Sequence, residues 1–129
     1  MREIKFRAWD ENSQEMIYEV GITPEGIPYS IPENAEGCDQ FNYFLTCHKM
    51  QYTGLKDKSE ARQEIWEGDI RKDALGRIFK VVYENDLAAF YGEYTNGHYD
   101  SLGDCGPDSE FLGTVYQNPE LLEASHASK

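Results

Sequence analysis

Residues 77–83 read Arg-Ile-Phe-Lys-Val-Val-Tyr, and this run indicates the fold class more clearly than any other part of the chain. Branched and aromatic side chains of this kind favour β-strands. Residues 73–76 (Asp-Ala-Leu-Gly) precede the run and residues 84–86 (Glu-Asn-Asp) follow it, and both have the composition of turns. Beyond these turns, Ile70 and residues 87–94 are again β-prone. The pattern predicts successive strands joined by short turns.

The same pattern recurs at the start of the chain. Residues 3–9 alternate apolar and charged, which predicts a half-buried strand with its apolar residues on one face and Lys5 and Arg7 on the other. Residues 10–14 are short and polar, as in a turn, and residues 16–20 read as a second strand. Residues 3–20 therefore predict a β-hairpin.

The middle of the chain is less regular. Residues 21–37 are rich in proline and glycine, which predicts an irregular loop or a sheet edge, whereas residues 41–52 are aromatic and predict one or two strands. Residues 53–64 are polar and admit either a helical turn over residues 59–64 or a long hairpin connection. Residues 67–69 (Glu-Gly-Asp) predict a tight turn or bulge with glycine at positive φ.

Residues 111–116 predict a last strand, and Asn118 followed by Pro119 predicts the start of a short helix. The expected fold class is mainly β, with small barrel-like or curled antiparallel sheets and a short C-terminal helix. We expect a single domain over residues 1–129 that can divide into two lobes. The lobes would be an N-terminal hairpin and loop lobe (1–55) and a small barrel-like lobe (64–122), followed by a tail (123–129).

The charge balance is acidic, with 24 Asp and Glu against 12 Lys and Arg and a formal net charge of −12. Such a surface repels phosphate backbones, which disfavours non-specific nucleic-acid binding without excluding a local basic patch. The best candidate patch consists of Arg71, Lys72, Arg77 and Lys80, interrupted by Asp73, and it resembles an ordinary solvated strand face. The favoured explanation of the negative charge is solubility. The alternatives are attraction of a basic partner and mimicry of nucleic acid.

The compartment follows from the cysteines and the N-terminus. Three cysteines without a regular framework argue against a secreted disulfide scaffold. The charged start shows no signal peptide, and no apolar run approaches the length of a membrane span. We expect a cytoplasmic protein with reduced thiols and no contact with a membrane.

Three groups of residues have side chains that could form a chemical site. Glu67 and Asp69 could hold a metal ion or act as an acid–base pair, but turn chemistry explains them completely. A zinc site would need Cys38, Cys47, His48 and Cys105, whose spacing lacks the close ligand pairs typical of zinc.

A cysteine–histidine pair would combine Cys105 or Cys38 with His98 or His48, yet nothing in the sequence marks a base or an oxyanion site. His126 is expected to be solvated in the tail. We therefore assign no catalytic, cofactor-binding or metal-binding residue, and the binding residues stay unknown.

An aromatic cluster offers a further possibility. It consists of Phe90, Tyr91, Tyr94 and Tyr99. Aromatic residues interleaved with polar ones can form a recognition surface, although they more often pack one face of a sheet onto the core. Packing is the favoured interpretation here.

Four blocks of the sequence resemble the YopX family of phage and prophage proteins: residues 2–10, 50–58, 64–70 and 113–122. Residues 59–63 depart from the family pattern, because they are longer and lack the glycine of its usual short connection. The resemblance implies a β-rich fold with a barrel-like part and an origin in the bacterial cytoplasm. It implies no established activity, cofactor or ligand.

The expected function is that of an uncharacterised phage or prophage accessory protein that binds a phage or host macromolecule without catalysis. A nucleic-acid-associated small barrel is the alternative, and a hydrolase or metal-dependent enzyme is a third. Exposed sheet edges make a homo-oligomer possible.

Overall fold

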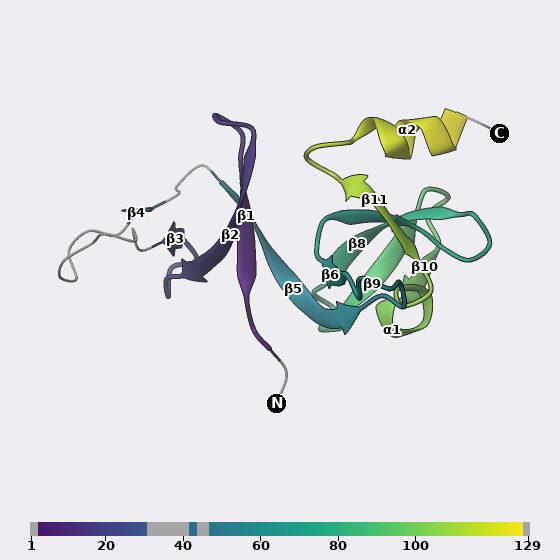
Figure 1. Cartoon of the computed structure of the whole chain (residues 1–129), viewed down its shortest axis with the longest axis horizontal. Helices are drawn as coiled ribbons and strands as arrows, with labels where there is room; N and C mark the ends of the chain where they lie inside the picture. The colour runs from purple at the N-terminus through teal and green to yellow at the C-terminus, as the bar shows by residue number, and fades with distance from the viewer. Residues whose placement is uncertain (1–2, 31–41, 44–46, 128–129) are drawn as a thin grey trace. The chain divides into compact units, whose positions relative to one another are not determined.

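The chain divides into two compact units, Met1–Gln51 and Tyr52–Lys129. The computed structural model describes residues 3–30, 42–43 and 47–127 of them (Figure 1). Strands dominate both units, and the described part of the chain contains two helices. The prediction of a mainly β fold is therefore confirmed.

The N-terminal unit is built on antiparallel strands in the order β4-β3-β2-β1-β5. The predicted hairpin is present, because β1 pairs with β2 along its whole length. The Asp10 carboxylate stabilises the turn between them by accepting hydrogen bonds from the Asn12 N–H and the Ser13 hydroxyl, both at 3.0 Å. The strands are β1 (Phe6–Asp10), β2 (Glu15–Ile22), β3 (Pro28–Ser30), β4 (Asn42–Tyr43) and β5 (His48–Lys56).

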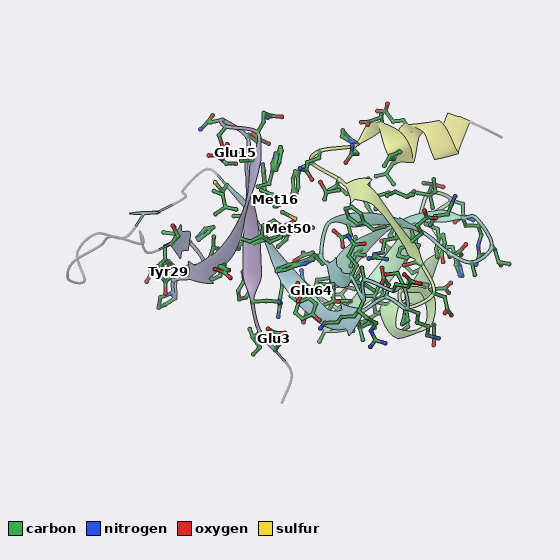
Figure 2. The ribbon with its side chains drawn as sticks, viewed as in Figure 1. Glu3, Glu15, Met16, Tyr29, Met50 and Glu64 are labelled. Atoms are coloured by element: carbon green, nitrogen blue, oxygen red, sulfur yellow. The ribbon has the colours of Figure 1, made fainter. Side chains whose placement is uncertain are left out.

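The predicted division of β1 into an apolar face and a charged face is wrong. Arg7 is buried to the same degree as Ala8, whereas Ile4 lies before the strand and is 62% exposed. Two features explain the difference. The strand is central, with β2 on one side and β5 on the other, and its register with β2 shifts between Phe6 and Arg7. Met50 of β5, labelled in Figure 2, pairs with Arg7 across the sheet and is also buried.

The proline- and glycine-rich stretch contains one short strand, β3, and residues 31–37 of it lie outside the described residues. Two strands, β4 and β5, occur in the aromatic stretch 41–52, as expected. The second of them continues to Lys56, and its positions beyond residue 52 alternate between half-buried and exposed. Its last part belongs to the C-terminal unit, where Tyr52 pairs with Trp66 of β6 (Glu64–Trp66).

The C-terminal unit contains a five-stranded antiparallel sheet in the order β10-β9-β8-β7-β11. The strands predicted around residues 77–83 and 87–94 are both present, as β8 and β9. The expected barrel is not confirmed, because among the described strands β10 pairs with β9 and β11 with β7, which leaves the sheet open. The strands are β7 (Asp69–Lys72), β8 (Ile78–Glu84), β9 (Ala89–Tyr94), β10 (Tyr99–Ser101) and β11 (Glu110–Thr114).

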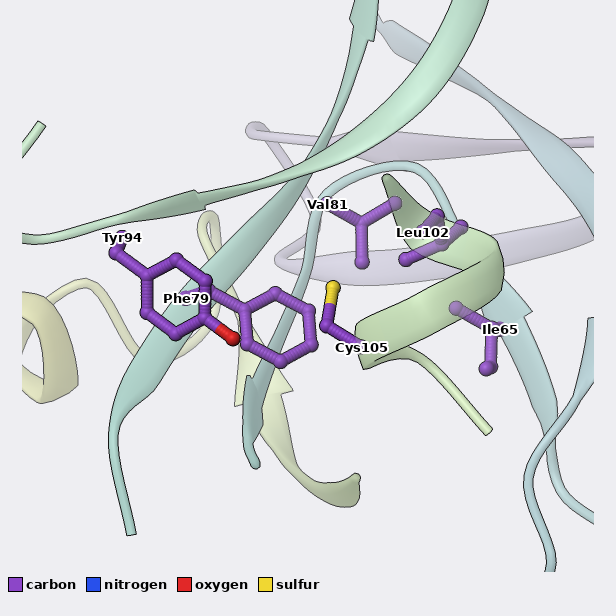
Figure 3. Packing of buried hydrophobic residues seen from close by; sticks show 6 residues of the cluster. All are labelled: Ile65, Phe79, Val81, Tyr94, Leu102 and Cys105. Carbon is purple, nitrogen blue, oxygen red and sulfur yellow. The ribbon is translucent and has the colours of Figure 1, made fainter. Parts of the chain in front are cut away.

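A small hydrophobic core lies on one face of this sheet (Figure 3). Helix α1 (Leu102–Cys105) contributes Leu102 and Cys105 to it, and Gly92 of β9 lets the helix approach closely. A Cβ atom at Gly92 would lie 2.7 Å from the Cys105 Sγ atom. The core residues are Ile65, Phe79, Val81, Tyr94, Leu102 and Cys105.

The C-terminal helix α2 (Glu120–Ala127) is longer than the short helix predicted. The Asn118 side chain accepts a hydrogen bond from the backbone N–H of Thr114, 3.3 Å away, and so contacts the end of β11. Neither helix in the described part of the chain combines the length and apolar character needed to cross a membrane.

Candidate functional site

Residues 57–63 form a connection organised by one carboxylate. The Asp57 Oδ1 atom accepts hydrogen bonds from the N–H and hydroxyl of Ser59, at 3.1 and 2.6 Å, and from the Gln63 N–H at 3.0 Å. A backbone hydrogen bond from Asp57 N–H to the Gln63 carbonyl, 2.9 Å long, closes the loop. The structure therefore has the long hairpin connection between β5 and β6, and not the helical turn.

The other oxygen of Asp57 faces a buried arginine. Arg71 is fully buried on β7, and its Nη1 and Nη2 atoms lie 3.4 and 3.3 Å from the Asp57 Oδ2 atom. Nη1 also donates to the carbonyl and hydroxyl oxygens of Ser109, both at 3.1 Å. The Asp69 Oδ2 atom lies 3.9 Å from Arg71 Nε. We call Arg71, Asp57, Asp69 and Ser109 the Arg71 cluster.

The Arg71 cluster has a structural role. Burial raises the pKa of the Asp57 carboxyl, but hydrogen bonds from Ser59, Gln63 and Arg71 outweigh burial and hold the pKa below its ordinary value. Through these bonds one guanidinium ties the loop at residues 57–63 and the segment at Ser109 to β7. The buried Arg71 Nε atom makes no hydrogen bond within the described part of the chain and faces the Asp69 carboxylate at 3.9 Å.

The candidate basic patch does not form a solvated strand face. Arg71 belongs to the buried cluster, and the exposed Arg77 pairs with Asp73, with Nη2 2.9 Å from Oδ2. The Lys80 ammonium lies 3.6 Å from the Glu93 carboxylate. Carboxylates thus neutralise three of the four positive charges that the sequence placed together, and the prediction of an ordinary exposed patch is wrong for Arg71.

A small acidic pocket lies in the C-terminal unit, where the β7–β8 turn, the end of β9 and helix α1 come together. Its volume is about 180 Å³, and four aspartates contribute to its walls. We call this the acidic pocket; it is lined by Asp73, Ala74, Leu75, Arg77, Tyr94, Asp100, Asp104, Cys105 and Asp108.

Asp73, Arg77 and Tyr94 form a connected group in the wall of the acidic pocket. The Tyr94 hydroxyl donates to the Asp73 Oδ2 atom at 2.8 Å, and Arg77 Nε donates to the same oxygen at 2.9 Å. The Arg77 guanidinium lies 4.9 Å from the centroid of the Tyr94 ring, within the range of a cation–π contact. The Asp73 Oδ1 atom accepts from the backbone N–H groups of Leu75 and Arg77, which fixes the turn.

The remaining aspartates add negative charge around this group. Asp100 contacts the His98 ring at 3.0 Å, and Asp108 pairs with Lys58 at 3.2 Å, in both cases near solvent. Asp104 is an exposed residue of α1. Burial raises the pKa of Asp73, but hydrogen bonds from Arg77, Tyr94 and Leu75 dominate and lower it, so the carboxylate is charged at neutral pH. Four aspartates and one arginine therefore line the same pocket.

The candidate zinc ligands are divided between the two units, and one of them lies outside the described residues. The His48 ring nitrogen lies 2.7 Å from Glu11, Cys105 lies in the core of the other unit, and Cys38 lies outside the described residues. Within the described ranges, no three His, Cys, Asp or Glu residues form a group that could hold a metal ion. The acidic pocket is thus not arranged as a metal centre.

The cysteine–histidine pair weighed from the sequence lacks an activated thiol at Cys105. Burial, reinforced by the charge of Asp100, raises the pKa of Cys105 to about 11, so the thiol is protonated at neutral pH. Reactive cysteines need the opposite shift. His98 contacts the side chain of Asp100, while the side chain of His126 lies outside the described residues.

The Glu-Gly-Asp motif forms the turn between β6 and β7. Gly68 has a φ of 89°, which favours glycine over residues with a Cβ atom. The buried Asp69 carboxylate accepts a hydrogen bond from the Trp66 N–H at 2.8 Å across the turn. The motif thus shapes the backbone, as turn chemistry predicts.

The aromatic cluster divides between packing and surface. Tyr94 packs against Phe79, with ring centroids 5.3 Å apart, and Phe90 contacts Tyr83 edge-on at 5.0 Å. Tyr99 is 43% exposed on β10. Packing, the favoured interpretation, holds for Tyr94 and Phe90.

The sequence did not reveal the acidic pocket, because Asp73 and Asp100 belong to two turn-rich segments far apart in the chain.

A family model described as YopX protein matches residues 5–123. The chain belongs to the YopX family. The resemblance carried by the four sequence blocks is therefore confirmed.

Two solved structures share the fold over almost the whole chain. Protein EF1440 from Enterococcus faecalis is 26% identical, covers 95% of this chain and 99% of its own, and superposes with a TM-score of 0.62. Protein yopX from Bacillus subtilis is 18% identical, covers 94% and 98% respectively, and has a TM-score of 0.60. No curated protein sequence matches the chain significantly. These likenesses support the YopX fold and name no activity.

Proposed function

We propose that the chain is a non-catalytic binding module whose acidic pocket recognises a basic segment of a partner macromolecule. The observation that carries the proposal is the placement of four aspartates and the Tyr94 side chain around one small concavity. A volume of about 180 Å³ is below the range of roughly 300–1,000 Å³ typical of small-molecule pockets, so it suits a single side chain better than a metabolite.

The charge of the whole chain supports this partner chemistry. A formal charge of −12 attracts a basic segment at long range and accelerates its association at low salt. The same charge opposes nucleic-acid binding, and the pairing of Arg71, Arg77 and Lys80 with carboxylates removes the local patch that could have offset it.

The proposal includes a cellular setting. We place the protein in the bacterial cytoplasm, as a phage or prophage accessory protein that binds a phage or host protein. Membership of the YopX family and the bacterial sources of the two similar structures support this placement. The open sheet edges at β10 and β11 make self-association a further part of the proposal, and light scattering would detect it.

A labelled hexalysine peptide tests the proposed chemistry by fluorescence anisotropy. We expect binding at low salt that weakens as salt rises. The double variant Asp100→Asn/Asp104→Asn should weaken it about fivefold, because two pocket charges are removed. The control Asp86→Asn/Glu60→Gln removes the same charge from exposed sites that do not line the pocket, and should have a smaller effect.

Equal losses in both double variants would show attraction by bulk charge alone and overturn the pocket assignment. Absence of hexalysine binding at low salt would overturn the proposal as a whole. Salt-sensitive binding of a DNA or RNA oligonucleotide in place of the peptide would favour the nucleic-acid alternative.

A further inference from the structure

A second and larger pocket lies in the C-terminal unit, between helix α2 and the sheet. Its volume is about 450 Å³, its walls are mostly apolar, and we call it the α2 pocket. It is lined by Lys80, Glu93, Tyr94, Thr95, Gly97, Leu122 and Glu123. Strands β8 and β9 supply one side, and α2 supplies Leu122 and Glu123 on the other.

The β9–β10 turn borders the α2 pocket through Gly97. Gly97 has a φ of 90°, and a Cβ atom built on it would meet no atom within 4 Å. The turn closes through a hydrogen bond from the Gly97 N–H to the Tyr94 carbonyl, 2.9 Å long. The positive φ therefore favours glycine at this corner, and the space around it is open.

The charges at the α2 pocket indicate the kind of occupant. Lys80 and Glu93 face each other across β8 and β9 with 3.6 Å between their charged atoms, so they largely cancel. Glu123 is exposed and adds a further negative charge. An apolar wall with a net acidic rim is complementary to an apolar side chain that is flanked by basic residues.

Tyr94 lines both the α2 pocket and the acidic pocket. The Tyr94 ring faces helix α1 and Asp73, whereas Lys80 and Glu93 face α2, so the two concavities lie on opposite faces at the same end of the sheet. A single segment reaches both by passing round that end of the sheet. A volume of about 450 Å³ lies within the range of pockets that bury apolar groups, unlike the smaller acidic pocket.

We infer that the α2 pocket takes an apolar anchor, of leucine or phenylalanine size, from the same basic segment that the acidic pocket recognises. The inference rests on the proposed function and narrows it from a basic segment to a mixed basic and apolar one. Buried apolar anchors supply much of the binding energy in protein recognition, whereas rim charges mainly supply specificity and association rate.

Two matched peptide series test the inference. In the first, one lysine of hexalysine at a time is replaced by leucine, and in the second the same positions carry alanine. Net charge is equal within each matched pair, so any difference reports burial of the leucine side chain. We expect that, for at least one position of the substitution, the leucine peptide binds about tenfold more tightly than the alanine peptide.

Variants of the protein test whether the leucine side chain of the peptide binds in the α2 pocket. Leu122→Ala should remove the leucine advantage, whereas Leu121→Ala changes a neighbouring residue of α2 that does not line the pocket and should preserve it. Thr95→Phe fills the pocket without removing an apolar contact and should also abolish the advantage. Circular dichroism checks that each variant is folded.

Equal binding of the leucine and alanine peptides in every register would overturn the inference. If Asp100→Asn/Asp104→Asn still weakened both series, the proposed function would stand without an apolar anchor. If neither series bound, both proposals would fall. Equal effects of Leu121→Ala and Leu122→Ala, or no effect of Thr95→Phe, would also overturn the assignment to the α2 pocket.

Discussion

Two arginine–aspartate pairs of the C-terminal unit have the same chemistry and different surroundings. Arg71 and Asp57 are almost completely buried, and their charged atoms lie 3.3 Å apart. Arg77 and Asp73 lie 2.9 Å apart at the edge of the acidic pocket, with the Arg77 side chain 52% exposed. The buried pair joins segments 14 residues apart in sequence, whereas the exposed pair spans one turn.

The comparison shows that burial, more than the distance between the charged atoms, decides how much an ion pair matters to the stability of the fold. Taking charges out of water is costly, so a buried pair has to be complete, and loss of one partner leaves the other without compensation. In the second pair the Asp73 side chain is only 8% exposed but keeps hydrogen bonds from Tyr94, Leu75 and the Arg77 backbone, whereas the Arg77 guanidinium is half exposed and screened by water. This guanidinium therefore contributes less to stability and can exchange partners. The Arg71 cluster therefore belongs to the fold, and the Arg77 pair is available for recognition.

The largest expected effect is on stability. Arg71→Leu leaves Asp57 and Asp69 buried without their guanidinium, and should lower the free energy of unfolding by about 3–5 kcal/mol in urea denaturation. Arg77→Leu is the matched control and should stay close to the wild type. Similar losses in the two variants would remove the distinction between the pairs.

The next effect concerns the thiol beside the exposed pair. With a pKa of about 11 against an ordinary value of 9.0, Cys105 should have a roughly 100-fold smaller thiolate fraction at pH 8 than an unperturbed thiol. A Cys38→Ser/Cys47→Ser protein isolates it for reaction with a disulfide reagent. Cys105 in the folded protein should react at least 100-fold more slowly than in urea-unfolded protein. Comparable rates would show that folding does not suppress the reactivity of this thiol.

Lowering the pH should weaken the stabilising contribution of both arginine–aspartate pairs. The pKa values of Asp57 and Asp73 are lowered by folding, so their contribution to stability is complete above the ordinary value of 3.8. It is lost as the pH falls below that value, through the folded pKa of each group. Thermal midpoints measured from pH 7 to pH 2.5 should fall less steeply in Asp57→Asn and Asp73→Asn, and unchanged slopes would argue against these shifts.

The smallest effect is expected from Arg77→Gln. This variant removes the guanidinium from the Asp73 Oδ2 atom and from the face of Tyr94, so hexalysine should bind a few-fold more tightly while stability changes little. Anisotropy titrations and urea curves give the two readouts. Weaker peptide binding would mean that Arg77 helps to form the pocket and does not compete with the partner.

Local patterns were sufficient for the hairpins. The turn at residues 73–76 and the strands on both sides follow from side-chain period and turn chemistry, which act within a few residues. Strand β10 and helix α1 were missed, because each is very short and the surrounding Gly, Asn and Asp residues favour turns. Tertiary packing stabilises α1, whose Leu102 and Cys105 are buried in the core.

The candidate site was harder to predict for a related reason. Arg71 and Arg77 look equivalent in the sequence, since both flank β-prone residues and have acidic neighbours. Their partners differ in sequence distance, and only the pairing of β7 with β8 and β11 places Arg71 inside the unit. The acidic pocket likewise needs the turn at Asp73 and the segment at Asp100 to meet.

The sequence by itself determined the mainly β class, most of the strands, the turns at glycine and the family, because these depend on local side-chain preferences and ordered motifs. The tertiary structure alone decided that Arg7 and Arg71 are buried, that the C-terminal sheet is open, and that four aspartates share a pocket. Burial and long-range pairing depend on which distant segments meet, and no local pattern encodes that.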